Sequence, residues 1–344
     1  MEYGAIDLHT KRSQIRIVDA EGRVLLDRKV DTTRVDLERV FGLRPPLRIL
    51  VESSTESEWV AQHLESLGHT VIVADPNYAP MYGSRSRKIK TDKRDVAALA
   101  EANRTGVFRR AHRVSAAAQT LRQMLRVRQH AVRMRGRTIS LLRALVRREG
   151  LRLASGSAEH VLARLDRLTI PASLTEGIAP LRALLTAVNQ IVATQDTAVA
   201  TRAAADPTAR LLMTAPGVGP VVALTFQAVL DDPARFGGSA ARASAFLGLV
   251  PAEDSSAERQ RKGHITKTGP TDLRALLVQA SWVIWRGRSA AGADLRRWAH
   301  ALADRRGRRI AVVALARRVS RLLYAMWRDQ QAFVVRPTRA GVAA

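Results

Sequence analysis

The sequence predicts an α/β domain with a mixed sheet, followed by a chain that is helical to near its end. Strand and helix patterns alternate over the first hundred residues, beginning with a hairpin and continuing as strand, helix and strand. From Asp92 onward, apolar residues recur with a helical period instead. Asp206-Pro207 then marks a boundary inside the helical part.

The elements of the first domain follow from its apolar runs and turn residues. The hairpin is expected to turn at Glu21-Gly22, and a helix from Glu56 to Leu67 is expected to stop at Gly68. In chain order, the predicted segments are the strand "YGAIDLH", the hairpin "SQIRIVDAEGRVLLDRKV", a short helix from Asp31 to Phe41, the strand "LRILVES", the helix from Glu56, and the buried strand "TVIVADP".

Two apolar stripes with four-three spacing predict a long helical hairpin in the middle of the chain. Arg128 and Arg135 occupy two positions of the first stripe. The spacing predicts an antiparallel coiled coil, within the chain or between chains, and it does not distinguish a solvated helical spacer from a dimer or RNA contact. The stripes consist of Leu121, Leu125, Val132, Ile139, Leu142 and Val146, and of Leu181, Leu184, Val188, Ile191, Gln195 and Val199.

The segment from Leu211 to Leu230, "LLMTAPGVGPVVALTFQAVL", runs for twenty residues without a charge. Proline and glycine interrupt it near its start, so it predicts a turn leading into a buried helix and not a membrane span. Its "TAPGVGPVVAL" portion resembles the hairpin of a helix-hairpin-helix, whose glycine-rich turn can present backbone N–H groups to a phosphate.

Two further helices are predicted after an irregular polar stretch, Thr271 through Trp285 and Arg309 to Arg328. The tryptophans of this region fall at core-like spacing on helices, which favours core packing over base stacking. They are Trp282, Trp285, Trp298 and Trp327. The apolar stripe of the last helix consists of Ile310, Val313, Leu315, Val319, Leu322 and Leu323.

The charge of this 344-residue chain is large and unevenly distributed. The formal net charge is +25, of which residues 1–105 contribute +1 and residues 106–205 and 206–344 contribute +12 each. Arginine supplies 49 of the 56 basic residues, and its planar guanidinium matches phosphate. Coding bias could explain the excess of arginine over lysine but not the net charge, so nucleic acid is the expected partner.

The chain has no cysteine, which excludes disulfides and thiolate metal sites and fits a reducing cytoplasm. Glu2 and Asp7 interrupt the only N-terminal apolar stretch, so no signal peptide is predicted. We therefore expect a cytoplasmic protein with no membrane partner.

Acidic residues stand at two strands and one helix start of the first domain. Asp7 lies within "GAIDLH", and Glu52 ends the strand "RILVES". A carboxylate in an apolar strand needs a partner, because burying an unpaired charge is costly. Asp92 and Asp95, at i and i+3, share one face of a first helical turn. In isolation, a cap by Asp92 and a dipole contact by Asp95 are the favoured explanation of that pair.

The four positions together indicate a metal site, because a ribonuclease-H-like fold gathers carboxylates from a first strand, a fourth strand and a following helix. Two carboxylates about 4 Å apart repel by ~4 kcal/mol at an effective dielectric of 20, so the cluster needs a divalent cation. His9 and His264 have no partner at ligand spacing and are left unassigned, so the expected ligands are carboxylate oxygens. Oxygen ligands alone favour Mg²⁺ or Mn²⁺, which serve phosphodiester chemistry. Lys90, Lys93 and Arg94 are then expected to hold the nucleic-acid backbone.

A second candidate site lies in the segment "GLVPAEDSSAERQRKGHITKTGPTDLR". Ser255 and Ser256 stand there in a polar loop. A loop serine is more often turn chemistry than a nucleophile, and no His or Asp base is recognisably placed. The neighbouring cations could stabilise charge during phosphoryl transfer. They are Arg259, Arg261, Lys262 and Lys267.

Together these motifs resemble the IS-one-ten family of insertion-sequence transposases, the DEDD recombinases. The resemblance extends to about Trp327. It is carried by "GAIDLH", "LVESSTES", "KTDKRDVAALA" and the long ordered run "TAPGVGPVVAL…RFGGSAARASAFLGLVPAEDSSAERQRKGHITKTGPTDLRALL". It implies a RuvC-like catalytic domain over residues 1–108, a helical coiled-coil linker or oligomerisation region over 109–205, a C-terminal transposase domain over 206–332 and a disordered tail over 333–344.

The resemblance also implies roles for individual residues. The family's serine directly precedes a glycine, whereas the matching pair here is Ser256-Ala257. The nucleophilic role is therefore assigned to Ser256 with Ser255 as the fallback, and alanine disfavours conformations that glycine permits. The implied metal-binding tetrad consists of Asp7, Glu52, Asp92 and Asp95.

By this resemblance, the protein exchanges DNA strands by serine attack on a phosphodiester, assisted by Mg²⁺, through a transient 5′-phosphoserine link. The acidic and serine domains come from different subunits, which requires a homo-oligomer, either a dimer or a tetramer. Family members are guided by a structured bridge RNA that pairs with donor and target DNA. The net charge outside the first domain is compatible with an RNA and two duplexes.

Two other functions fit the residues. One is a RuvC-like metal-dependent nuclease or junction resolvase, which cleaves by metal-activated water without a covalent step. The other is a non-catalytic nucleic-acid-binding relic of a mobile element. A covalent protein–DNA adduct distinguishes the serine mechanism from the nuclease. Variants of the acidic residues distinguish an active enzyme from the non-catalytic relic.

Overall fold

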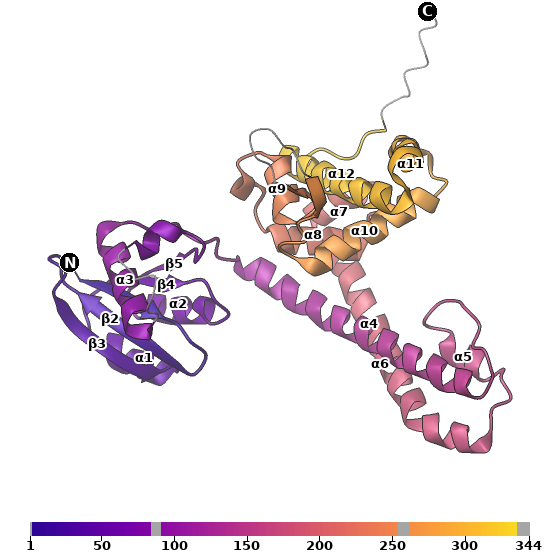
Figure 1. Cartoon of the computed structure of the whole chain (residues 1–344), viewed down its shortest axis with the longest axis horizontal. Helices are drawn as coiled ribbons and strands as arrows, with labels where there is room; N and C mark the ends of the chain where they lie inside the picture. Colours follow the sequence, from indigo (N-terminus) through magenta and orange to yellow (C-terminus); the bar gives the residue numbers. More distant parts are fainter. Residues whose placement is uncertain (1, 84–90, 254–261, 336–344) are drawn as a thin grey trace, which may run out of the picture. The chain divides into compact units, whose positions relative to one another are not determined.

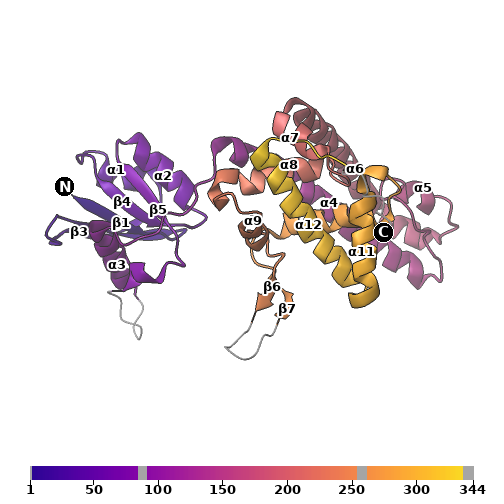
Figure 2. The ribbon, with the colours of Figure 1, turned by 90° about the horizontal axis from the view of Figure 1, so that it is seen from above.

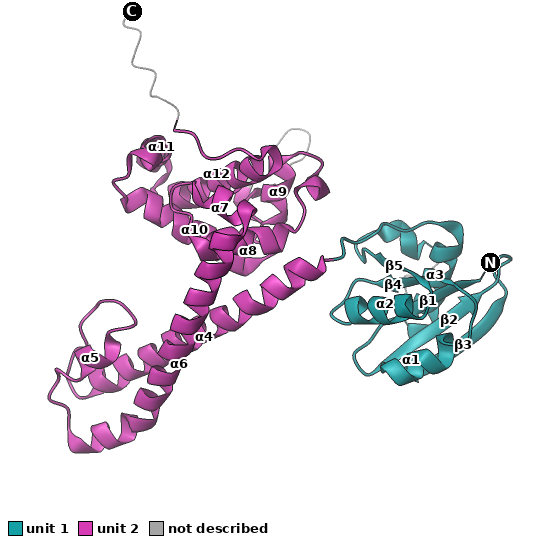
Figure 3. Ribbon diagram, turned by 180° about the vertical axis from the view of Figure 1, so that it is seen from behind, with its two compact units in different colours: residues 1–113 teal, residues 114–344 magenta. Residues whose placement is uncertain are grey.

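The computed structural model describes residues 2–83, 91–253 and 262–335. The chain divides into two compact units, one spanning residues 1–113 and the other residues 114–344 (Figure 3). Each unit has its own hydrophobic core.

Unit 1 is a five-stranded sheet with helices on both faces (Figures 1 and 2). Its strand order is β3-β2-β1-β4-β5; β1 and β3 run antiparallel to β2, whereas β4 runs parallel to β1 and to β5. This is the mixed sheet that the sequence predicts. The elements are β1 (Tyr3–Asp7), β2 (Arg12–Val18), β3 (Val24–Asp31), α1 (Arg34–Phe41), β4 (Arg48–Glu52), α2 (Ser57–Ser66), β5 (Thr70–Ala74), the 3₁₀ helix η1 (Ala79–Tyr82) and α3 (Asp92–Thr105).

The two faces of the sheet are covered by different helices, because successive residues of a strand point to opposite faces. One face packs against α1 and α2, where Phe41 and Leu64 are fully buried. The opposite face packs against α3, where Ala5 and Leu50 share a cluster with Val96. Every second residue of β1, counted from Ala5, therefore points to the face that α3 covers.

Local backbone geometry explains one predicted boundary and corrects another. The hairpin between β2 and β3 turns where the sequence predicts, and Gly22 has φ +85°, a conformation that favours glycine. The predicted start of the next helix at Asp31 is wrong, because Asp31 ends β3. The helix begins at Arg34, since Thr33 is extended and its side chain accepts a hydrogen bond from the Asp36 N–H.

Unit 2 begins with a helical hairpin formed within one chain. The long helices α4 and α6 lie side by side, and the short α5 packs against their far ends (Figure 1). Leu142 and Val146 of α4 meet Ile178 and Leu185 of α6 in a buried cluster there. The helices are α4 (Ala116–Arg148), α5 (Val161–Leu165) and α6 (Ala172–Ala205).

The contact stripe of α6 is displaced by one residue from the predicted one at two places. Leu184 and Ile191, which the sequence analysis assigns to the stripe, are 40% and 46% exposed, whereas their neighbours Leu185 and Val192 are buried. Leu184 and Ile191 are seven residues apart, and so are Leu185 and Val192, so both pairs fit the spacing of a helical stripe. The apolar pattern alone could not decide between them.

The two arginines of the α4 stripe are paired with acidic residues. Arg128 donates from Nε to Oδ1 of Asp196 on α6 at 2.5 Å, and Arg135 donates from Nη1 to Oε1 of Glu159 at 3.0 Å. Both arginine side chains are largely shielded from solvent. Each guanidinium therefore has a charged partner where it interrupts the apolar contact.

The rest of unit 2 is a helical body around one core that includes Phe226, Leu315 and Tyr324. A two-stranded hairpin, β6 and β7, extends from it (Figure 2). The elements are α7 (Pro207–Met213), α8 (Pro220–Leu230), η2 (Pro233–Phe236), α9 (Ala240–Phe246), β6 (Pro251–Glu253), β7 (Lys262–Ile265), α10 (Thr271–Arg286), η3 (Ala290–Gly292), α11 (Ala293–Arg306) and α12 (Arg308–Asp329).

The charge-free segment at 211–230 forms the end of α7, a turn and the buried helix α8, as predicted. Gly217 in the turn has φ +75°, and a Cβ there would lie 2.7 Å from the carbonyl oxygen of Ala280 on α10. The turn thus requires glycine both for its conformation and for its close approach to α10. No helix within the described residues has both the length and the hydropathy needed to cross a bilayer.

Several features of this body differ from the predictions. The stretch expected to be irregular contains β6 and β7, and α11 forms around Trp298, a position predicted to lie on a helix for which no bounds are given. Ile310, assigned to the last stripe, is exposed, and so is Trp298, whereas Trp327 is buried as expected. Of the expected tail, residues 333–335 are described, and the backbone N–H of Phe333 donates to Oγ1 of Thr214 at 2.9 Å. The rest of that tail lies outside the described residues.

Candidate functional site

Asp7 is the last residue of β1 and a buried one. It lies two residues after Ala5, so its side chain points to the face that α3 covers. β1 and β4 pair in parallel with Ile6 opposite Val51, and one further step of this register sets Asp7 opposite Glu52. Glu52 ends β4 and points to the same face as Leu50. The first and fourth strands thus bring two carboxylates to one corner of the sheet.

The start of α3 brings two more carboxylates to that face. Thr91 is the N-cap: its backbone is extended, and its side chain accepts a hydrogen bond from the Arg94 N–H. The alternative in which Asp92 caps the helix is therefore wrong. Asp92 is the first helical residue, and Asp95 follows one turn later in a buried position. Asp95 packs closely enough for its charge to act on Asp7.

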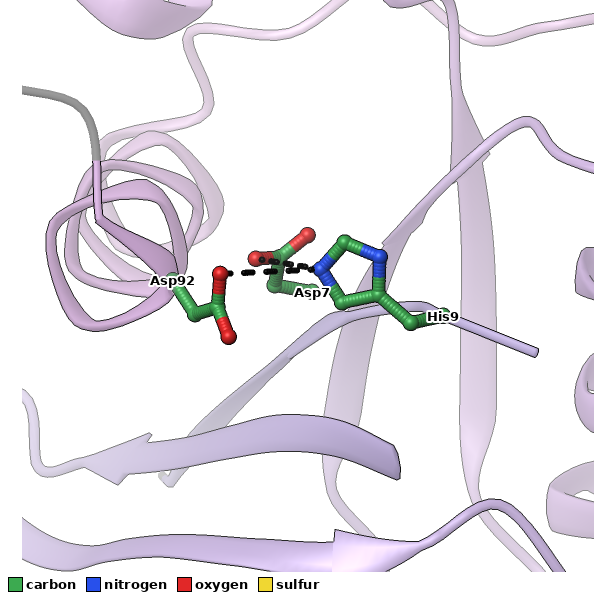
Figure 4. A group of neighbouring side chains, drawn as sticks. All are labelled: Asp7, His9 and Asp92. Atoms are coloured by element: carbon green, nitrogen blue, oxygen red, sulfur yellow. Dashed lines mark ion pairs between the residues drawn. The ribbon is translucent and has the colours of Figure 1, made fainter. Parts of the chain in front are cut away.

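His9 joins the two carboxylates in one group (Figure 4). Its Nε2 lies 3.5 Å from Oδ2 of Asp7 and 3.8 Å from Oδ1 of Asp92, and the three candidate ligand atoms lie within 4.8 Å of one another. The main chain of His9 is fixed at both ends. Its N–H donates to Oγ of Ser13 at 3.3 Å, and its carbonyl accepts from Oγ1 of Thr32 at 2.7 Å.

The two carboxylates of this group have opposite electrostatic environments. Burial raises the pKa of Asp7 above its ordinary value; the imidazole of His9 opposes this rise, and the charges of Asp95 and Asp92 add to it. The pKa of Asp92 lies below its ordinary value, chiefly because Lys29 of β3 donates a hydrogen bond to its carboxylate at 2.8 Å. The site therefore holds one carboxylate that resists ionisation and one that is stabilised as an anion.

The donor set suits a divalent cation. Carboxylate oxygens are hard ligands, and a neutral imidazole nitrogen adds a donor that Mn²⁺ accepts more readily than Mg²⁺ does. A cation would also relieve the repulsion that raises the pKa of Asp7. These residues fit a divalent metal, and they come from a strand end, the loop after it and a helix start.

The predicted site residues are not all brought together. Asp7 and Asp92 converge with His9. Glu52, on the adjacent strand, and Asp95, on α3, are not in the group of ligand atoms within 4.8 Å. Lys93 and Arg94 lie exposed in the first turn of α3 and form no ion pair with another described residue. Lys90 lies outside the described residues.

His9 and Lys29 are the members of this site that sequence reasoning missed. His9 has a signal in the sequence, because residues two apart at a strand end can face the same side as Asp7. Lys29 has none, since its contact with Asp92 depends on how β3 and α3 are placed in the folded unit.

The serine segment lies mainly outside the described residues, which include neither Ser255, Ser256, Arg259 nor Arg261. Lys262 is described as the first residue of β7. The segment connects β6 to β7, which pair in antiparallel register, so the structure fixes where its two ends are held. Lys267 follows β7, is exposed, and has a left-handed φ of +56°.

Arg274 of α10 holds the base of this hairpin. Its guanidinium is buried and donates from Nη1 to the carbonyl oxygen of Leu247 at 3.0 Å and to that of Thr268 at 2.7 Å. Leu247 precedes β6 and Thr268 follows β7, so one side chain joins the two arms. Gly269 packs beside this junction, where a Cβ would lie 2.1 Å from the carbonyl oxygen of Phe246.

Comparison with known proteins matches both parts of the chain to transposases. Residues 5–149 match a family model for transposases of the DEDD type, and residues 209–295 match the transposase family IS116/IS110/IS902. A "Probable family 20 transposase" of Pseudomonas aeruginosa is 28% identical over 93% of this chain and 95% of its own length.

Two other relatives align over similar spans. The transposase for insertion sequence element IS1111A of Coxiella burnetii is 25% identical over 95% of this chain and 90% of its own length. The transposase for insertion sequence element IS1328 of Yersinia enterocolitica is 24% identical over 93% of this chain and 94% of its own length. With the acidic unit and the serine-bearing body each matched in chain order, the chain belongs to the IS116/IS110/IS902 family of transposases, enzymes that cut and transfer DNA.

Proposed function

We propose that this protein exchanges DNA strands for a mobile insertion sequence, using a metal-assisted acidic site and a serine nucleophile. The observation that carries the proposal is the convergence of Asp7 and Asp92 beside His9. These residues lie within the part of the chain that matches the DEDD transposase model. Membership of a transposase family makes DNA the partner, and the acidic site supplies chemistry suited to phosphodiesters.

We propose Asp7, Glu52, Asp92 and Asp95 as the residues that hold Mg²⁺ or Mn²⁺. His9 is a further ligand or an orienting neighbour of Asp7, because its Nε2 reaches both carboxylates. When bound, a divalent cation activates the attacking oxygen and stabilises the leaving one. Lys93 and Arg94 are exposed beside this site and free to hold DNA phosphates, and Lys90 precedes them in the sequence.

The proposed covalent step takes place at Ser256. Its Oγ attacks the phosphorus of the scissile phosphodiester, the Oγ–P bond forms, and the P–O3′ bond breaks. The hydroxyl proton leaves Oγ, and the departing 3′ oxygen takes up a proton. A 3′-hydroxyl from the other strand then attacks the same phosphorus, breaks the Oγ–P bond and regenerates the serine.

Three observations support nucleic-acid contacts beyond the acidic site. The two segments after residue 105 each carry a net charge of +12, which suits a large polyanion such as a guide RNA with donor and target DNA. The cations flanking the serine segment would neutralise the phosphate under attack. The glycine turn between α7 and α8 is a further candidate for a phosphate contact.

We also propose that the protein acts as a homo-oligomer, a dimer or tetramer, in which the acidic unit of one subunit serves the serine segment of another. The support is that the two sites belong to separate compact units. In a mixture of Asp7→Asn and Ser256→Ala chains, some sites would combine an intact acidic unit with an intact serine. Recovery of activity in that mixture tests the arrangement.

The experiment that tests the function uses the full chain with DNA from either side of its gene and Mg²⁺. Denaturing electrophoresis then detects a covalent protein–DNA adduct. We expect the adduct in the wild type and in Ser255→Ala, and its loss in Ser256→Ala, Asp7→Asn and Asp92→Asn. Asp36→Asn is the matched acidic control, because Asp36 lies in the first turn of α1.

Two results would contradict the proposal. Strand exchange that continues in both serine variants, without an adduct, would indicate a nuclease that uses activated water. Strand exchange unchanged in Asp7→Asn and Asp92→Asn would remove the acidic site from the reaction.

Ala257→Gly is expected to increase adduct formation, since it restores a residue that permits left-handed conformations.

A further inference from the structure

An exposed basic turn at the junction of α11 and α12 takes no part in the proposed reaction. We call it the arginine turn, and it consists of Arg305, Arg306, Arg308 and Arg309 around Gly307. All four arginines are exposed, and none forms an ion pair with another residue in the described parts of the chain. Asp304 is the only acidic residue between positions 295 and 327. Four uncompensated guanidinium groups in one turn form a strong local site for a polyanion.

The arginine turn is continuous with a row of aromatic rings. The guanidinium carbon of Arg308 lies 5.9 Å from the ring centroid of Trp282 on α10, and that of Arg286 lies 5.0 Å from it. Trp282 meets Trp285 edge-on at 6.2 Å, and Trp285 stacks on His300 of α11 at 4.1 Å. These rings come from neighbouring helices that Figure 1 shows together.

A hollow of about 520 Å³ opens beside Trp282 and is lined by Gln279, Val283, Arg286 and Gly287 as well. Val283 is 59% exposed in this hollow. An exposed apolar side chain next to a half-buried tryptophan is a surface that gains from being covered. The occupant must present a flat apolar group to the tryptophan and negative charge to the arginine turn.

Unpaired nucleotides combine these two properties. Each has a negatively charged phosphate and a base whose flat face can stack on an aromatic ring or a guanidinium plane. In a duplex the base faces are buried against one another, so duplex DNA can reach the arginine turn but cannot stack on Trp282. An apolar protein partner would satisfy the hollow but leave the four charges unmatched.

We propose that the arginine turn and Trp282 bind a single-stranded DNA segment, with phosphates on the arginines and a base at Trp282. The inference rests on the proposed function, because strand exchange separates the strands of a duplex. It adds a site for the separated strand, held on α10 and the α11–α12 junction.

The test measures binding of a labelled twelve-nucleotide single-stranded DNA by fluorescence anisotropy, with EDTA present so that no cleavage takes place. Trp282→Ala is expected to weaken binding about five-fold or more, and Trp282→Phe to retain most of the affinity. Replacing the four arginines with alanine should lower the slope of log affinity against log salt by roughly 0.7 for each phosphate contact removed.

Matched controls separate this surface from general charge and folding. Trp298→Ala removes a tryptophan that is exposed and also has an arginine over its ring, because the guanidinium carbon of Arg318 lies 4.7 Å from the ring centroid of Trp298. Lys11 and Arg28 are exposed in unit 1, outside the two strongly basic segments, and replacing both removes charge elsewhere. Both controls should bind the oligonucleotide nearly as the wild type does, and circular dichroism confirms the fold of each variant.

Specific outcomes overturn the inference. An equal loss in Trp282→Ala and Trp298→Ala would assign the effect to packing, and an equal loss for duplex DNA would exclude base stacking. A larger dependence on Trp282 for an RNA of the same sequence would assign the surface to RNA. Asp7→Asn separates the two proposals: it should abolish strand exchange and leave this binding unchanged.

Discussion

Lys29 and Asp92 form an ion pair in unit 1, with Nζ of the lysine 2.8 Å from Oδ2 of the aspartate. The lysine comes from β3 and the aspartate from the first turn of α3. Asp92, a candidate metal ligand, is therefore already paired with a positively charged side chain. A divalent cation at Asp92 would lie close to this ammonium group, so the two cations repel each other or compete for one carboxylate.

We predict that Lys29→Met binds Mn²⁺ more tightly than the wild type, by about two- to five-fold, because removing the ammonium group removes that competition. Isothermal titration calorimetry on the full chain measures the affinity. Lys11→Met is the matched control, since Lys11 is exposed and lies before β2, outside the site. Weaker Mn²⁺ binding in Lys29→Met would show that the lysine assists the metal instead.

Asp7→Asn should stabilise the metal-free protein at neutral pH. Burial raises the folded-state pKa of Asp7, so the stability that its protonated form contributes is full below the unfolded pKa of ~3.9 and is lost as pH rises through the folded pKa. Asparagine remains neutral throughout. In EDTA near neutral pH, we expect the Tm to rise by a few degrees, the shift that roughly 1 kcal/mol produces.

The pH dependence of melting provides a control for Asp7→Asn. Near pH ~2.5, well below the unfolded pKa of ~3.9, the carboxyl is protonated in both the folded and the unfolded chain, so the wild type and Asp7→Asn should melt alike. Mn²⁺ should stabilise the wild type near neutral pH and leave Asp7→Asn unchanged. A variant that melts below the wild type in EDTA at neutral pH would mean that Asp7 is stabilised as an anion.

Arg274→Lys should loosen the base of the β6–β7 hairpin. Lysine cannot reproduce the two hydrogen bonds that the guanidinium donates to Leu247 and Thr268, and a buried carbonyl left without a donor costs about 1–3 kcal/mol. Denaturant unfolding should show that loss, and adduct formation should fall with it. Arg296→Lys is the control, because the hydrogen bond that Arg296 donates among the described residues is an exposed one, at 3.4 Å to the carbonyl oxygen of Ser289. Equal unfolding midpoints for the two variants would contradict the assignment.

Neighbouring leucines of α6 provide a paired test of the helical hairpin. Leu185 is fully buried against α4, so Leu185→Ala should destabilise unit 2 by about 2–5 kcal/mol. Leu184 is 40% exposed, and Leu184→Ala should change stability by less than about 0.5 kcal/mol. Thermal unfolding compares them directly. A large effect of Leu184→Ala on sedimentation, with unchanged unfolding of the monomer, would indicate that another subunit covers this side of α6.

The strands of unit 1 were predictable because their apolar runs are bounded by turn residues, as at Gly22 and Gly68. The acidic group was predictable in outline, since its members end strands or start a helix. The β6–β7 hairpin was not, because the residues of β6 are all exposed and carry no alternating pattern. Lys29 could not be assigned either, because its partner is 63 residues away and only the folded unit brings them together.

The pairing of Arg128 with Asp196 limits which insertions and deletions the helical hairpin of α4 and α6 can accept. The two residues stand opposite each other on helices that run in opposite directions, with the tip of the hairpin beyond them. Adding one residue to either helix near the tip would rotate later side chains out of alignment, whereas adding a heptad to both would preserve it. We therefore expect natural variants of this arm to grow or shrink by whole heptads in matched pairs, so that its reach changes in discrete steps.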